Sequence, residues 1–153
     1  MARRIVPEEI ARAWWPCTHL NSSGADAVQI IHGWPGSVLE FLDVIESLSA
    51  PESAEDPAFH LVIPALPGMG FSGPTHSTGW TMRRVAEAWI ELMDRLGYQR
   101  FGAIGNDGGS MVSPEIGRLA PGRVMGVHVT QLFSFPVGDN INAQRIGVQR
   151  YVH

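Results

Sequence analysis

The sequence predicts an α/β fold in which a mostly parallel sheet is flanked by helices. Short apolar runs that end in glycine-rich turns alternate with longer segments whose apolar residues recur at helical spacing. The predicted strands are 27–31, 59–65, 101–105 and 124–130, and the predicted helices begin at residues 37, 81 and 109. This alternation favours parallel strands joined by right-handed crossovers.

Each predicted helix carries a local signal for its start, its end or an irregularity. Ser37 and Glu40 have the three-residue spacing of a capping box, and Thr81 is the expected N-cap of the second helix, which Gly97 ends. Pro114 lies inside the third helix, where a missing backbone hydrogen bond predicts a kink or an irregular first turn. The apolar stripe expected to face the sheet from the first helix comprises Phe41, Leu42, Ile45 and Leu48.

Length and composition restrict the chain to one globular domain. Its 153 residues are enough for a hydrophobic core and too few for two ordinary domains. Apolar residues make up 44% and charged residues 17%, a balance typical of folded proteins. The net charge of −4 argues against nucleic acid or an anionic membrane as the main partner. The sequence shows no apolar run long enough to span a bilayer and no signal peptide.

Cysteine and histidine usage indicates neither a disulfide nor a metal site. Cys17 is the only cysteine, which excludes an intramolecular disulfide and fits a reducing, cytoplasmic setting. The six histidines show none of the close pairs on which zinc sites are built. We therefore predict a cytoplasmic protein with no metal and no cofactor.

A turn of small residues follows the third predicted strand: Gly105-Asn106-Asp107-Gly108-Gly109. A sharp strand-to-helix turn needs small residues two before and two after its centre, because Cβ atoms there would collide as the backbone reverses. Asp107 would then be held in a strained, exposed conformation over the edge of the sheet. An ordinary Asn-Asp-Gly-Gly loop is the alternative. The apolar strand before the turn and the helical segment after it favour the elbow.

A second turn, His32-Gly33-Trp34-Pro35-Gly36, follows the first predicted strand. Ligands of open parallel sheets bind where the strands end, so we expect the two turns to form one site. The backbone N–H groups of Trp34 and Gly108 could pair there as an oxyanion hole. For His32 we prefer a hydrogen-bonded core imidazole that braces the loop over a catalytic role.

These two turns, with the run 59–72 and its Gly68-x-Gly70-x-Ser72 turn between them, resemble the epoxide hydrolases of the α/β-hydrolase superfamily. The resemblance is closest to the microsomal and juvenile-hormone type and covers roughly residues 24–135. It implies that Asp107 is the nucleophile and that Trp34 and Gly108 supply the oxyanion-hole amides. The residues that it implies shape the two turns are His32, Gly33, Pro35, Gly105 and Gly109.

The chemistry implied by this resemblance suits an aspartate. A carboxylate is already ionised at neutral pH, so it can open a strained epoxide ring by direct displacement and leave an alkyl ester on the enzyme. A histidine-activated water then attacks that ester, and the oxyanion hole stabilises the tetrahedral intermediate. In this family two tyrosines of a cap domain protonate the epoxide oxygen. The expected substrate is a small epoxide.

The resemblance also implies groups that we do not find in the sequence. In the superfamily an acid and a catalytic histidine follow the nucleophile. After Asp107, His128 falls on a strand predicted to be buried, and His153 is the last residue. We therefore expect a partial α/β-hydrolase fold without the cap domain and the C-terminal half. Such a chain would turn epoxides over very slowly, or stall after a single alkylation of Asp107.

The predicted organisation has three parts: an atypical segment 1–23, a partial α/β-hydrolase core 24–135 and an unassigned tail 136–153. A sheet that ends at its fourth strand would expose an apolar edge, through which the chain could self-associate. Two alternatives stay open. A haloalkane dehalogenase uses the same aspartate elbow, but it usually holds the halide with a tryptophan where this chain has Gly108. A non-catalytic fragment or partner-dependent module would keep the fold without the activity.

Overall fold

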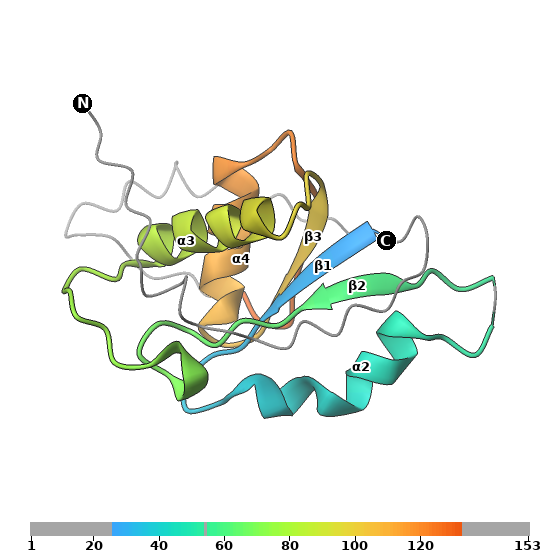
Figure 1. Ribbon diagram of the computed structural model, residues 1–153, viewed down its shortest axis with the longest axis horizontal. Coiled ribbons are helices and arrows are strands. Elements are labelled where there is room, and N and C mark those ends of the chain that lie inside the picture. The colour runs from blue at the N-terminus through green and yellow to red at the C-terminus, as the bar shows by residue number, and fades with distance from the viewer. Residues whose placement is uncertain (1–25, 54, 133–153) are drawn as a thin grey trace.

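The computed structural model describes residues 26–53 and 55–132 (Figure 1). The predicted segments 1–23 and 136–153 lie outside the described residues. The elements, in chain order, are β1 (Asp26–Ile31), the 3-10 helix η1 (Val38–Phe41), α2 (Leu42–Ser49), β2 (Phe59–Val62), the 3-10 helix η2 (Gly70–Ser72), α3 (Met82–Arg95), β3 (Phe101–Gly105), α4 (Gly109–Leu119) and β4 (Val124–Val129).

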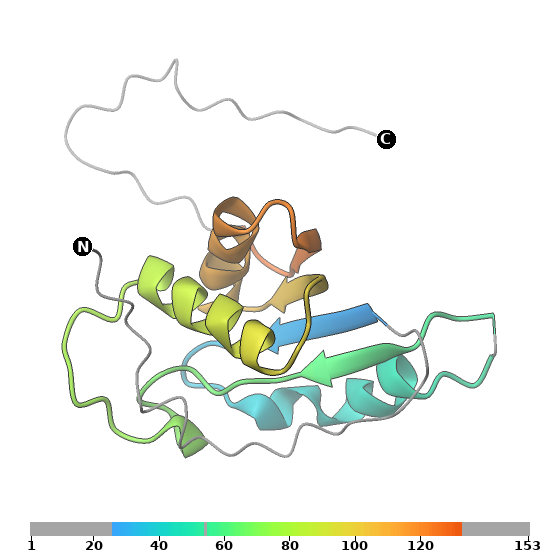
Figure 2. The same cartoon turned by 45° about the horizontal axis from the view of Figure 1, so that its top comes forward.

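The four strands form one parallel sheet in the order β2-β1-β3-β4. The predicted parallel sheet with flanking helices is therefore confirmed. Figure 2 shows α3 and α4 on one side of this sheet and α2 on the other. Since β1 and β3 are neighbours, the turns that follow them lie side by side at the carboxyl edge of the sheet.

Apolar side chains on both faces of the sheet form the core. Toward α3 and α4, one cluster joins Ile31 and Phe101 to the helical residues Trp89 and Ile116. Toward α2, a smaller cluster is built on three buried strand residues and packs against Phe41, Ile45 and Leu48. Strand β1 supplies residues to both clusters, because successive side chains of a strand point to opposite faces.

The N-terminal caps were predicted correctly, but one residue that was expected to face the sheet does not. Ser37 and Glu40 form the predicted capping box, and the Thr81 side chain accepts a hydrogen bond from the Arg84 amide as an N-cap. Leu42 was expected to face the sheet, but it is 57% exposed. It lies about 100° around the helix from Phe41, at the margin of the apolar stripe. Helix α4 is continuous through Pro114.

Two strands differ from the prediction. Strand β2 ends at Val62 and not at residue 65, because Pro64 has no N–H group to continue the ladder. Strand β4 was predicted to be buried, with His128 inside, and this was wrong: Met125 through His128 are exposed. Within the described residues, β4 pairs with β3 alone, so its outer side has no strand to cover it.

Candidate active site

Asp107 adopts an unusual backbone conformation at the end of β3. Its φ is +44°, and among the described residues it is the one non-glycine residue with positive φ. A side chain in this region of φ is strained unless the surrounding structure holds it there. Asp107 lies between the last residue of β3 and the first turn of α4. This is the geometry of a sharp strand-to-helix elbow that presents one side chain at the sheet edge.

The glycines on either side of Asp107 make the elbow possible. A Cβ atom on Gly105 would overlap the backbone of Gly109, and a Cβ atom on Gly109 would overlap the carbonyl of Ile31. All of these neighbours are backbone atoms of packed elements, which have little freedom to move aside. The small residues two before and two after Asp107 are therefore required by the close approach of α4 to β1 and β3.

The turn after β1 contacts the Asp107 carboxylate directly. The Trp34 amide donates a hydrogen bond of 2.8 Å to Oδ1 of Asp107. A Cβ atom on Gly33 would collide with the Asp107 side chain and with the Gly108 amide nitrogen, so the two turns touch at Gly33. The Trp34–Pro35 peptide is cis, and Trp34 is 73% exposed.

The Trp34 amide contacts the carboxylate, and the Gly108 amide follows Asp107 directly in the chain. The Trp34 amide already points at Oδ1. The Gly108 amide lies at the start of α4, where the first N–H groups of a helix have no partner within the helix. A helix N-terminus also favours negative charge. Both amides that the sequence nominated for an oxyanion hole therefore lie beside Asp107, together with Gly33, although the sequence separates them widely.

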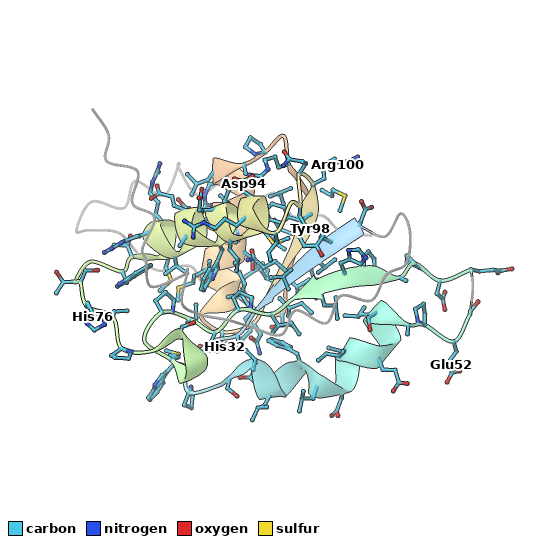
Figure 3. The ribbon with its side chains drawn as sticks, in the orientation of Figure 1. His32, Glu52, His76, Asp94, Tyr98 and Arg100 are labelled. Atoms are coloured by element: carbon cyan, nitrogen blue, oxygen red, sulfur yellow. The ribbon has the colours of Figure 1, made fainter. Side chains whose placement is uncertain are left out.

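His32 lies where β1 ends, beside the loop that follows β2 (Figure 3). Its imidazole is fully buried. The Leu66 amide donates to Nε2 at 3.2 Å, so Nε2 must be the unprotonated nitrogen, and Nδ1–H then donates to the Gly33 carbonyl at 2.8 Å. The ring joins the loop after β2 to the turn that carries Trp34. Both ring nitrogens are therefore engaged by backbone groups, which is the arrangement expected of a residue that braces the loop.

One polar contact at the site has no counterpart in the sequence-based prediction. The Asn106 side-chain amide, one residue before Asp107, donates to Oε2 of Glu40 at 2.7 Å. The sequence assigned Glu40 to a capping box, which occupies only its other carboxylate oxygen. No sequence pattern marks the second contact, because its partner is 66 residues away.

Within residues 26–53 and 55–132, no group of three or more His, Cys, Asp or Glu side chains is placed to hold a metal ion. No helix in the same part of the chain has the length and apolar character needed to cross a membrane.

Comparison with known proteins places this elbow in a family. Residues 26–139 match the model of the alpha/beta hydrolase fold family. A protein of Stigmatella aurantiaca assigned as an epoxide hydrolase is 44% identical over 124 residues, which cover 77% of this chain and 28% of that relative. The crystal structure of juvenile hormone epoxide hydrolase from the silkworm Bombyx mori superposes with a TM-score of 0.61 at 35% identity, over 70% of this chain and 29% of that one.

The chain belongs to the alpha/beta hydrolase fold family. Its relatives within that family include epoxide hydrolases, some of the juvenile-hormone type, so the expected resemblance is confirmed. The chain spans less than a third of the length of these relatives. A haloalkane dehalogenase from Bradyrhizobium elkani also superposes, with a TM-score of 0.56 over 70% of this chain and 34% of that one, at 24% identity. That likeness shows the shared fold alone.

Proposed function

We propose that this chain carries the nucleophile and the oxyanion hole of an epoxide hydrolase. The observation that carries the proposal is the strained Asp107, whose carboxylate faces the Trp34 amide at the carboxyl edge of the sheet. A carboxylate held in this way can displace an epoxide oxygen without a base to activate it. The epoxide hydrolases among the relatives support the same chemistry.

The hydrogen bond to Trp34 assigns different roles to the two carboxylate oxygens. Since Oδ1 accepts from the Trp34 amide, we assign the attack to Oδ2 of Asp107. The new bond joins Oδ2 to an epoxide carbon, the bond from that carbon to the ring oxygen breaks, and the ring oxygen takes a proton from solvent water. The product of this step is a hydroxyalkyl ester of Asp107, whose carbonyl oxygen is Oδ1.

Ester hydrolysis uses the same amides. Water adds to Cγ of Asp107, and negative charge develops on Oδ1, which the Trp34 amide already contacts and which the Gly108 amide flanks. Donors placed where the oxyanion forms contribute about 3 kcal/mol each to such a step. Collapse of this intermediate releases a diol and returns Asp107 to its carboxylate form.

Activation of the water is the step that the described residues do not supply. His32 is buried and uses both ring nitrogens, and His60 shares a hydrogen bond with Tyr98. His76 lies exposed in the loop before α3, and His128 lies exposed on β4. We therefore expect the 153-residue chain by itself to form the ester and to release it slowly.

The test is to incubate the full chain with styrene oxide and follow its intact mass. We expect a single adduct, which peptide mapping places on Asp107 and which the Asp107→Ala variant does not form. Asp94→Asn is the matched control, since Asp94 pairs with Arg123 at the far end of α3. An adduct that persists in Asp107→Ala, or the absence of any adduct on the wild-type chain, would overturn the proposal.

The haloalkane dehalogenase reading uses the same displacement but needs a donor for the departing halide. A side chain at position 108 would project toward Gly33 and Leu66, whose nearest atoms lie 3.4 and 3.6 Å from a Cβ atom built there. Glycine has no side-chain N–H group to place in that space. This favours an epoxide as the substrate, because the oxygen of an epoxide stays attached to the product and does not have to be held as a leaving ion. Halide release from 1-chlorobutane with concurrent alkylation of Asp107 would reverse this preference.

A further inference from the structure

The Glu40 carboxylate links the two turns of the site. Its Oε1 accepts the backbone N–H of Ser37 at 2.8 Å, directly after the turn that carries Trp34. Its Oε2 accepts the side-chain N–H of Asn106 at 2.7 Å, directly before Asp107. The two oxygens therefore take one donor each, Oε1 from Ser37 beside the first turn and Oε2 from Asn106 in the elbow. Hydrogen bonds to an ionised acceptor are shorter and stronger than those between neutral groups.

Glu40 is exposed to solvent, and its carboxylate is placed by its two hydrogen bonds and by the glycine at position 36. A Cβ atom on Gly36 would fall on Oε1 of Glu40, so the carboxylate occupies the space that a side chain at position 36 would fill. The orientation of Asn106 is also determined, because a flipped amide would place its oxygen against the carboxylate. The Asn106 backbone N–H donates to the carbonyl of Ile31, which joins the same residue to the end of β1.

We infer that Glu40 is a positioning residue: it holds the turn that carries the Trp34 amide against the elbow that carries Asp107. The capping box alone would need only Oε1, whereas the bond from Asn106 to Oε2 joins two elements that are distant in sequence. Glu40 touches neither Asp107 nor Trp34 through any hydrogen bond that we observe, so it acts through Asn106 and Ser37. As far as it concerns catalysis, this inference rests on the proposed function.

A reciprocal exchange of groups tests this link. Asn106→Asp places a second carboxylate against Glu40 and should separate the turns. In the double variant Glu40→Gln/Asn106→Asp, the glutamine oxygen can still accept from Ser37 and its amide can donate to the new aspartate, so the link is restored. Thr81→Ala is the control, because it removes a comparable N-cap from α3, outside the site.

The first measurement is hydrogen exchange at the Trp34 amide by NMR in the full chain, relative to the amides of β3. We expect exchange to rise about fivefold in Asn106→Asp and in Glu40→Ala, and to return near the wild-type rate in the double variant. Thr81→Ala should leave the ratio unchanged. Unchanged exchange in Asn106→Asp, or no recovery in the double variant, would overturn the inference. If Asn106→Asp does not fold, Asn106→Ala removes the donor without adding charge and takes its place.

The second measurement is the rate at which styrene oxide alkylates Asp107 in the same variants. It should fall and recover in the same order as the protection of the Trp34 amide, which a purely stabilising role of Glu40 would not produce. If the wild-type chain forms no adduct, the proposed function fails. The exchange series still decides whether Glu40 holds the turns together.

Discussion

Strands β1 and β4 belong to the same sheet, but they differ in how deeply they are buried and in which elements lie beside them. Strand β1 buries every residue from Ala27 to Ile31, whereas β4 exposes every residue from Met125 to His128. Strand β1 has a strand on each side and apolar clusters on both of its faces. Strand β4 pairs only with β3 in the part of the chain that the structure describes, and it packs on α4.

The site depends on the central strands. The turn with the Trp34 amide follows β1, and the Asp107 elbow follows β3, its neighbour. A residue with positive φ persists where packed elements hold it, and the close contacts around Gly33, Gly105 and Gly109 provide that constraint. The edge of the sheet offers no comparable constraint, so the comparison predicts that substitutions at the centre are severe and that matched substitutions on β4 are mild.

The largest difference in stability is expected between two glycine-to-alanine substitutions, one at the elbow and one on β4. Gly109→Ala places a Cβ atom on the Ile31 carbonyl, and we expect it to lower the free energy of unfolding by about 3 kcal/mol. Gly126→Ala on β4 meets no atom within 4 Å and should change the same quantity by less than about 0.5 kcal/mol. Urea unfolding followed by circular dichroism measures both. Equal losses in the two variants would mean that the elbow tolerates a shift of α4.

Replacement of His32 or His128 by leucine should give a smaller difference in stability. His32→Leu leaves the Leu66 amide and the Gly33 carbonyl without their partners in a buried setting, which we expect to cost about 2 kcal/mol. His128→Leu alters an exposed side chain and should cost less than about 0.5 kcal/mol. Thermal unfolding of the pair checks this. A loss in His32→Leu as small as that in His128→Leu would argue against the bracing role.

The same contrast explains what the sequence could predict. The alternation of strands and helices, the capping box and the elbow follow from local patterns, since each depends on residues within a few positions of one another. The burial of β4 could not be read in this way: Val124, Val127 and Val129 have the composition of a core strand, but burial depends on which elements lie beside it. Leu42 was misplaced because the margin of a helical stripe is set by packing.

Within the site, the two turns that come together were easier to predict than the side-chain contacts between them, and the roles of their residues stay predictions. Trp34, Gly108 and Asp107 were nominated from two turns that each have a recognisable sequence. The second bond of Glu40 was missed, because a contact across 66 residues leaves no local pattern. The sequence also suggested a brace at His32, but not that its partner would be the Leu66 amide, 34 residues away.

The smallest expected effect concerns the apolar edge, where we predict weak self-association of two copies through β4. Among the described strands the outer edge of β4 is unpaired, and such an edge is a template for another strand. Met125 there is 38% exposed. Met125→Lys should weaken the association by roughly 1 kcal/mol, or about fivefold, because like charges would face each other across the paired edges. Sedimentation equilibrium over a range of concentrations measures this.

Leu42→Lys is the matched control, since Leu42 is an exposed leucine on α2, on a different part of the surface. It should leave the association unchanged. Because exposed charges are screened by salt, the effect of Met125→Lys should shrink as ionic strength rises. If Leu42→Lys weakens association as much as Met125→Lys does, the contact does not run through β4. The difference between the two strands would then be one of burial alone, and exposure of the edge would not by itself make it a binding surface.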